Sequence, residues 1–163
     1  MKCPQSLLKS LMTDMKLEDA HASFIKVMTE TMKILFVCTG NSFRSAVAEA
    51  LLKKFRSDFV VESAGTEPAS HIAKSAKELL KKENALGNLK SEPEGIEEKD
   101  VEGYDRIIVM KEGHKQVIIE RWSRAKNKIQ VWNIDDPIFL PLGSDKKIFA
   151  KIKGKVLEMA KTL

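Results

Sequence analysis

Four short apolar runs, separated by segments with helical periodicity, constrain the fold of this chain more than any other feature of its sequence. The runs span residues 34–37, 59–61, 107–109 and 129–132. The first is followed by a glycine-containing loop, as is typical of a buried strand in a parallel sheet. Apolar residues recur at helical spacing in residues 45–55, 72–82, 113–122 and a last segment capped by Ser144 or Asp145. Strands that alternate with helices predict an α/β domain with helices on both faces of a parallel sheet.

Two further segments lie outside this alternation. Residues 5–31 carry apolar side chains at helical spacing, which predicts one helix broken near residues 14–18, or two short helices. The apolar face of this segment has to pack on the domain or on a second copy of the chain. Residues 83–104 are polar and rich in glycine, and we expect loops there with a short helix near residues 97–101.

Length and charge limit the class of protein. A chain of 163 residues with 31% charged residues is typical of a single globular domain. The formal net charge is +5, but lysines alternate with acidic residues and aromatics make up only 6%, so we expect no nucleic-acid partner. A mildly basic field favours anionic substrates. No apolar run reaches the length of about 18 residues that a membrane-spanning helix needs, and the N-terminus does not resemble a secretory signal.

The cysteines and histidines indicate no metal site. Cys3 and Cys38 are far apart and form no CxxC pair, so we expect neither a metal nor a cofactor. Few cysteines in a charge-rich chain suggest a reduced, cytoplasmic protein. His21, His71 and His114 are expected to be surface or capping residues.

The loop after the first apolar run combines the groups that phosphate chemistry needs. The predicted strand delivers Cys38 to the sheet edge, and Gly40 and Asn41 tolerate a positive φ. A loop bent in this way turns its N–H groups toward one point, with a helix N-terminus behind it, which favours an anion and a thiolate. The planar fork of Arg44 suits two phosphate oxygens. The residues expected to hold a phosphate are Thr39, Gly40, Asn41, Ser42, Phe43, Arg44 and Ser45.

A purely structural interpretation of the loop is weaker. A cysteine at a strand end is often a small buried apolar residue. An arginine at the start of a helix, however, is disfavoured by the helix dipole. Arg44 therefore indicates a local anion that offsets its charge.

The loop Cys38–Ser45 resembles the signature loop of the low-molecular-weight protein tyrosine phosphatase family, which is Cys, five residues, Arg, then Ser or Thr. That family also contains bacterial protein-arginine phosphatases and thioredoxin-coupled arsenate reductases. VESAGT at 61–66, YDRIIVM at 104–110 and DDP at 135–137 resemble further family segments. The resemblance covers residues 32–163. It implies a three-layer flavodoxin-like fold with a four-stranded parallel sheet in the order 2-1-3-4, preceded by a helical extension over 1–31.

The resemblance also implies a mechanism. Cys38 is the nucleophile that forms a cysteinyl-phosphate, and Arg44 stabilises the phosphoryl oxygens. The family's general acid directly precedes proline, so Asp136 takes that role and Asp135 is a solvated neighbour. Asn41 is expected to hold the turn, and Ser45 to assist the sulfur as leaving group.

Four departures from the family pattern bear on the substrate. Phe43 stands where most members have a second cysteine, and a hydroxyl at Ser42 is closer to arginine phosphatases than to tyrosine-specific members. Ile138 and Phe139 replace a tyrosine pair that lines the pocket for an aryl group. The family's histidine that supports the loop asparagine is missing between residues 71 and 104.

We therefore expect a cysteine-dependent phosphatase that hydrolyses phosphotyrosine or related phosphomonoesters of proteins, acting on a phosphorylated protein or a small phosphomonoester. The alternatives, in order, are a protein-arginine phosphatase, an arsenate reductase, and a non-catalytic phosphate-binding or phosphocarrier module. For residues 1–31 two interpretations stay open. The segment mediates association of two copies, or it reflects an upstream start codon, because Met32-Lys33 resembles a natural start for the family.

Overall fold

The computed structural model describes residues 30–163. Residues 32–163 form one compact unit. Apart from residues 30 and 31, the expected helical extension lies outside the described residues, as do Cys3 and His21. The extension therefore stays a prediction.

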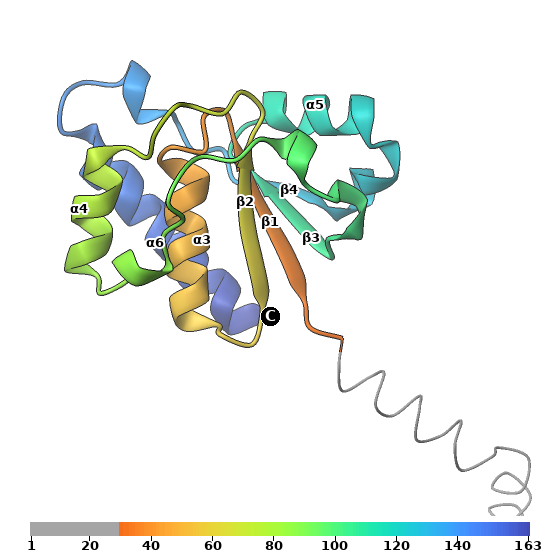
Figure 1. Ribbon diagram of the computed structural model, residues 1–163, viewed down its shortest axis with the longest axis horizontal. Helices are drawn as coiled ribbons and strands as arrows, with labels where there is room; N and C mark the ends of the chain where they lie inside the picture. The colour runs from red at the N-terminus through yellow and green to blue at the C-terminus, as the bar shows by residue number, and fades with distance from the viewer. Residues whose placement is uncertain (1–29) are drawn as a thin grey trace, which may run out of the picture. The chain divides into compact units, whose positions relative to one another are not determined.

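The centre of this unit is a four-stranded parallel sheet (Figure 1). Its strands are β1 (Lys33–Cys38), β2 (Val60–Gly65), β3 (Arg106–Val109) and β4 (Ile129–Val131). They lie in the order β2-β1-β3-β4, and every pair is parallel. The predicted flavodoxin-like arrangement is therefore confirmed, with the strand nearest the N-terminus in the interior of the sheet.

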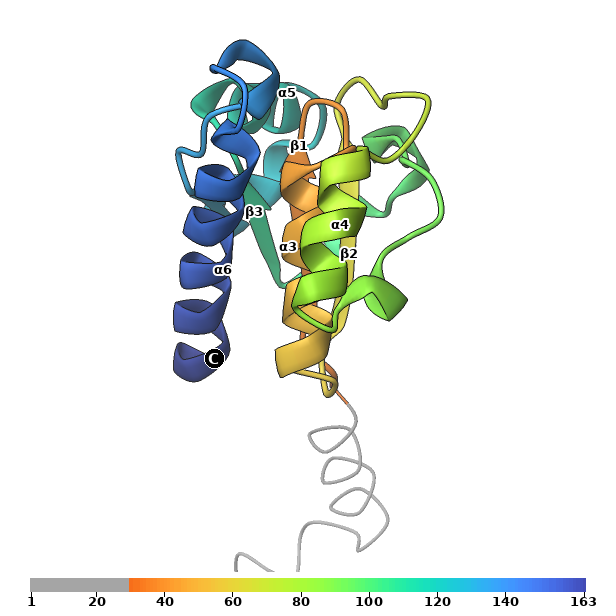
Figure 2. The same cartoon turned by 90° about the vertical axis from the view of Figure 1, so that its left-hand side faces the viewer.

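Helices cover both faces of the sheet, and β1 contributes to both cores. On one face, α3 (Arg44–Phe55) and α6 (Ser144–Thr162) pack beside each other, with α4 (Lys74–Lys82) against them (Figure 2). The other face carries α5 (Glu112–Arg121). Ile34 and Phe36 belong to the core under α3 and α6, whereas Leu35 and Val37 belong to the core on the α5 side. Because a strand turns successive side chains to opposite faces, a run buried on both sides has to be apolar throughout.

Some element boundaries differ from the sequence prediction. The helix expected from residue 72 begins at Lys74, and the final helix begins at Ser144 with Gly143 before it in the left-handed region, at φ 88°. Neither Ser144 nor Asp145 is therefore the N-cap. A glycine adopts a positive φ without steric cost, which lets the chain turn sharply into α6. Residues 83–104 contain three short 3-10 helices, Leu86–Asn88, Ile96–Glu98 and Val101–Gly103.

The chain continues along β3 after β4 ends at Val131. The N–H of Trp132 donates to the carbonyl of Val109 at 2.9 Å, and that of Ile134 to the carbonyl of Met110 at 2.8 Å. This pairing carries Asp136 to the same end of the sheet as Cys38, the last residue of β1. The carboxyl ends of parallel strands are where ligands bind in open α/β sheets. Among the described helices, none has the length and apolar character needed to span a membrane.

Candidate active site

The backbone of the loop after β1 is held by the segment 66–73. Four backbone hydrogen bonds of 2.9–3.0 Å join the two segments. The N–H groups of Thr66, Glu67, Ala69 and Ala73 donate, in this order, to the carbonyls of Cys38, Thr39, Gly40 and Ser42. In a trans peptide the C=O and the following N–H point in opposite directions. Fixing these carbonyls on one side therefore turns the N–H groups of the loop to the other side, where the Cys38 sulfur lies.

Asn41 sets the bend of the loop. It adopts a φ of 52°, in the left-handed region, while Gly40 does not. Of the two residues expected to tolerate a positive φ, only Asn41 therefore adopts one. Asn41 can take this conformation because its side chain has three hydrogen bonds. Its Nδ2 donates to Ser45 Oγ and to Ser63 Oγ, both at 2.8 Å, and its Oδ1 accepts from the backbone N–H of Glu94 at 2.9 Å.

The Cys38 sulfur has two hydrogen-bonding neighbours. The backbone N–H of Asn41 donates to Sγ at 3.2 Å, and Ser45 Oγ lies 2.9 Å from it. Ser45 Oγ accepts a hydrogen bond from Asn41, and the nearer acceptor for its own proton is the sulfur, at 2.9 Å, rather than the carbonyl of Ala64, at 3.5 Å. These two hydrogen bonds fix the sulfur at the base of the loop.

A buried polar chain stands behind Asn41. Ser63 Oγ accepts from Asn41 and donates to the carboxylate of Glu49. Glu49 lies between Lys53, at 2.6 Å, and Lys90, at 3.5 Å. Lys90 Nζ in turn donates to the carbonyl of Ser63 at 2.7 Å. The N–H of Glu94 and these buried partners support Asn41, a role that a histidine has in the family pattern. The sequence pattern alone did not show which residues replace that histidine.

Gly65 is required by close packing under the loop. A Cβ placed on Gly65 would lie 2.5 Å from the carbonyl oxygen of Thr39 and 3.0–3.1 Å from backbone atoms of Gly40 and Asn41. Backbone atoms of a strapped loop cannot move aside as a flexible side chain can. The last residue of β2 is therefore part of the site, although it carries no functional group.

Arg44 and Asp136 form an ion pair across the loop. Arg44 Nη2 donates to Asp136 Oδ2 at 2.8 Å, and Nη1 donates to the carbonyl of Ile134 at 3.1 Å. The Arg44 side chain is buried, whereas Asp136 is partly exposed. Asp136 is thus the local anion that offsets an arginine at the start of α3.

Asp135 points away from this pair. Its carboxylate is exposed and lies 2.5 Å from Lys111 Nζ, whose hydrogen bond and charge hold the pKa of Asp135 below its usual value. The structure therefore places Asp136 and not Asp135 at the loop, and Asp135 is a surface residue paired with a lysine.

His114 belongs to the site, contrary to the expectation of a surface residue, although its expected capping role is confirmed. Its Nδ1 accepts the N–H of Lys111 at the start of α5 at 3.1 Å. The ring proton therefore sits on Nε2, which donates to Thr39 Oγ1 at 2.8 Å. Burial, together with the charges of Arg44 and Lys111, lowers the pKa of His114 to about 4. No local pattern reveals this contact, because 75 residues separate Thr39 from His114.

The predicted residues line a common pocket of about 470 Å³. Its lining includes seven of the predicted residues, namely Cys38, Thr39, Gly40, Ser42, Phe43, Arg44 and Asp136. The other lining residues are Ala69, Ala73, Ser75, Pro137, Ile138, Phe139 and Asp145. Asn41 and Ser45 are buried behind the pocket and act through Cys38. The Ser42 hydroxyl donates to the carbonyl of His71 at 2.9 Å. A nucleophile, a cation and a carboxylate in one pocket suit the transfer of an anionic group.

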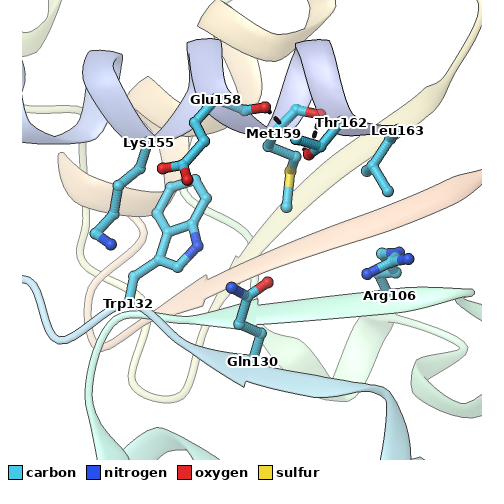
Figure 3. Close-up of a pocket in the computed structure, with 8 residues that line it drawn as sticks. All are labelled: Arg106, Gln130, Trp132, Lys155, Glu158, Met159, Thr162 and Leu163. Atoms are coloured by element: carbon cyan, nitrogen blue, oxygen red, sulfur yellow. Dashed lines mark hydrogen bonds between the residues drawn. The ribbon is translucent and has the colours of Figure 1, made fainter.

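A second pocket, of about 210 Å³, lies between the C-terminal half of α6 and the strands β3 and β4 (Figure 3). Arg106, the first residue of β3, and Gln130 face the side chains of Lys155 and Glu158 across it, with Trp132 beside them. Arg106 marks the amino end of β3, so this pocket opens away from the carboxyl ends of the strands. No cysteine lines this pocket, and ligands of open α/β sheets bind at the carboxyl ends of the strands, where the first pocket lies.

Comparison with known proteins agrees with this geometry. Residues 33–163 match the family described as "Low molecular weight phosphotyrosine protein phosphatase". A protein-arginine-phosphatase from Bacillus subtilis is 29% identical over 143 residues, which are 81% of this chain and 94% of that protein. A low molecular weight protein-tyrosine-phosphatase from Staphylococcus epidermidis is 30% identical over 65% of this chain and 81% of its own length. The crystal structure of a low molecular weight protein tyrosine phosphatase from T. tengcongensis superposes with a TM-score of 0.73 at 26% identity, covering 82% of this chain and all of that one.

The close approach of Gly65 to the loop predicts a specific loss in Gly65→Ala. The added methyl group has to push the backbone of Thr39 and Gly40 out of place, so we expect a destabilisation of about 2 kcal/mol and a fall in kcat/KM of about ten-fold or more. Urea unfolding and phosphatase assays measure the two effects. The matched control is Gly154→Ala in α6, where nothing lies within 4 Å of the new Cβ. This change should raise stability by about 0.5–1 kcal/mol and leave activity unchanged. Equal activity in both variants would contradict the packing argument.

The buried, neutral His114 predicts a pH dependence of stability. Its pKa is about 4 in the folded chain and 6.5 in an ordinary environment, so the unfolded chain binds more protons between these values. Stability should therefore fall as the pH drops from 6.5 to 4, with His114 contributing on the order of 2–3 kcal/mol. In His114→Gln the stability should depend less on pH in this window, as measured by denaturant midpoints at several pH values. His71→Gln, on the surface, is the control, and it should keep the wild-type slope.

Proposed function

The chain belongs to the low molecular weight phosphotyrosine protein phosphatase family, and from this premise we propose that its loop pocket hydrolyses a phosphorylated side chain of a protein through a cysteinyl-phosphate on Cys38. Membership makes the chain a phosphatase. The identity of the working residues and of the phosphorylated side chain is our proposal. The observation that carries it is the placement of the Cys38 sulfur, with two hydrogen-bond donors, in the same pocket as the Arg44–Asp136 ion pair.

In the first step the Cys38 thiolate attacks phosphorus. A bond forms between Sγ and phosphorus while the bond to the leaving oxygen or nitrogen breaks. Arg44 and the loop N–H groups neutralise the oxygens of the transferring group. The donated hydrogen bond from Ser45 stabilises the sulfur when it is released in the second step. All of these charges are present in the protein itself, so the step needs no metal ion.

Asp136 supplies the proton in this proposal. One carboxylate oxygen accepts the N–H of Ile138 at 3.2 Å, and the other is held by Arg44. When a bound phosphoryl group takes over the guanidinium of Arg44, the second oxygen of Asp136 is released. It then takes up a proton from water or from the phosphoryl group, and it can pass this proton to the leaving group. Asp136 then accepts a proton from the water that attacks the cysteinyl-phosphate and frees inorganic phosphate. The ion pair is thus a resting state that substrate binding opens.

Phosphoarginine is a second candidate substrate. Asp145 lines the pocket as a second carboxylate beside Asp136, and a guanidinium group on the substrate would find a counter-charge there. Ser42 places a hydroxyl at the position where the sequence differs from tyrosine-specific members, and the relative from Bacillus subtilis is named a protein-arginine-phosphatase. Phe139, at the pocket rim, favours an aryl group instead.

The remaining alternatives have less support. Arsenate reduction by the thioredoxin-coupled route needs two further cysteines, and Cys38 is the single cysteine among residues 30–163. A phosphocarrier would need neither Arg44 nor Asp136. We also propose that the chain works in the cytoplasm, because few cysteines in a charge-rich chain are typical of a reducing compartment. We propose no nucleic-acid partner, because the lysines alternate with acidic residues. Association of two copies through residues 1–31 stays a prediction.

A substrate panel tests the function. Para-nitrophenyl phosphate, a phosphotyrosine peptide and a phosphoarginine peptide are assayed side by side for released phosphate. Wild-type protein should hydrolyse at least one of them, and the ratio between the two peptides decides between the candidate substrates. Cys38→Ser should lower turnover by at least about 10⁴-fold while still binding inorganic phosphate in calorimetry. A wild-type protein that releases no phosphate from any of the three would refute the proposal.

The proposed acid has its own test in Asp136→Asn. The amide keeps the size of the side chain but cannot donate a carboxylic proton, so poor leaving groups should suffer most. We expect kcat/KM for phenyl phosphate to fall by about 100-fold or more, and for para-nitrophenyl phosphate by clearly less. Asp135→Asn, one residue away on the surface, is the matched control and should change neither value. Equal losses on the two substrates in Asp136→Asn would remove this residue from the acid role.

A further inference from the structure

The exposed apolar side chains of the described residues are concentrated in one loop. Six large apolar residues are exposed, namely Val60, Leu86, Ile138, Phe139, Leu140 and Leu142, and four of the six lie within five consecutive positions. Ile138 and Phe139 are 78% and 86% exposed, and Leu142 is fully exposed. Single exposed apolar residues are ordinary, but a contiguous group marks a surface that binds something.

This group sits on a well-defined loop, which we call the 137–143 loop. It begins with the 3-10 helix Pro137–Phe139 and ends at Gly143. Hydrogen bonds of 3.1–3.2 Å join Phe139 N to Asp136 O, Leu140 N to Pro137 O and Ser144 N to Pro141 O. Two prolines further restrict its backbone, because each locks its own φ. The apolar side chains are therefore presented by an ordered segment, which lowers the entropy that binding would cost.

A groove of about 480 Å³ separates this loop from α4. Leu79 of α4 faces Leu140 and Leu142 across it. Both views show the loop at the end of the unit where α4 and α6 begin, which is also the end that carries Cys38 (Figures 1 and 2). The groove shares Ser75, Pro137, Ile138 and Asp145 with the catalytic pocket. The two hollows are thus one continuous surface, with the phosphate site at one end and an apolar groove at the other.

We propose that this groove binds the polypeptide that flanks the phosphorylated residue of a protein substrate, and that it selects a large apolar side chain there. The inference rests on the proposed function, because the phosphorylated side chain has to enter the adjoining pocket. An extended chain advances about 3.3 Å per residue, so the residue that reaches the groove lies within two or three positions of the phosphorylated one. The charges around the groove, Glu78, Lys82, Asp145 and Lys146, balance in sign. Apolar contact rather than net charge therefore sets the preference.

Small substrates do not reach this groove. Leu140 and Leu142 line the groove but not the catalytic pocket. A phosphomonoester such as para-nitrophenyl phosphate fits within the catalytic pocket and should not sense these two side chains. A protein substrate can thus contact the groove, whereas a small phosphomonoester cannot. This difference favours a protein as the natural substrate.

The test compares peptides that differ at one position. The peptides are built on the phosphorylated residue preferred in the substrate panel, with leucine or serine placed at each position up to three residues on either side. Wild-type protein should prefer leucine over serine at one of these positions by about ten-fold in kcat/KM, mainly through KM. The double variant Leu140→Ser/Leu142→Ser should lose this preference and keep wild-type kcat/KM on para-nitrophenyl phosphate. Leu86→Ser, which removes an exposed apolar side chain outside the groove, is the matched control and should keep the preference.

The outcomes separate this inference from the proposed function. A wild-type protein that hydrolyses para-nitrophenyl phosphate but treats all leucine and serine peptides alike overturns the docking role and leaves the phosphatase intact. A preference that survives in the double variant overturns it as well. If sedimentation velocity shows a wild-type dimer that the double variant converts to a monomer, the groove binds a second copy of the chain and the proposal is wrong. Failure on every phosphorylated substrate, including para-nitrophenyl phosphate, refutes the phosphatase function itself.

Discussion

The site depends on the hydrogen bonds that hold Asn41 in its left-handed conformation. A residue with a β-carbon adopts this conformation at a steric cost of about 1 kcal/mol, which has to be offset locally. Three hydrogen bonds from the Asn41 side chain, to Ser45, Ser63 and the backbone of Glu94, provide that compensation. The bend they fix turns the N–H of Asn41 toward the Cys38 sulfur. The Cys38 sulfur is therefore positioned by a residue, Asn41, whose buried amide does not line the pocket.

The charges of the pocket are arranged so that it attracts an anion while remaining stable without one. Arg44 is buried, and an unpaired guanidinium in that position would be costly. Asp136 neutralises it in the free protein, at a distance of 2.8 Å. His114 adds no charge of its own at neutral pH, because burial and the neighbouring cations keep the ring neutral. In the proposed mechanism, a phosphoryl group that displaces Asp136 from Arg44 gains a full counter-charge, and the displaced carboxylate takes up a proton before it acts as the acid.

The loop and the rim of the pocket are held by different parts of the structure. The loop after β1, which the segment 66–73 holds in place, keeps the family's pattern of Cys, five residues, Arg and Ser, and it departs from most members at Ser42 and Phe43. The rim, formed by the 137–143 loop and α4, departs from it with Ile138, Phe139 and a further apolar surface. Rim residues are exposed and contribute little to folding, so they can change without disturbing the sulfur or the ion pair. In our proposal, the rim therefore acts together with Ser42 in selecting the substrate.

The sequence by itself determined the sheet and the reactive loop. Apolar runs alternating with helical segments suffice for a parallel α/β fold. Cys38 and Arg44 are recognisable by type and spacing, whereas Asp136 was assigned through the resemblance to the family. Their local patterns carry this information because a buried strand and a bent loop are specified by neighbouring residues. Only the tertiary structure decided which distant groups support them. Four features depend on segments that meet only after folding. They are the contact of His114 with Thr39, the packing of Gly65 beneath the loop, the support of Asn41 by Glu94 in place of the missing histidine, and the positive φ of Asn41 rather than Gly40. Sequence spacing records what lies next along the chain, whereas these contacts depend on how the sheet brings separate loops to one edge.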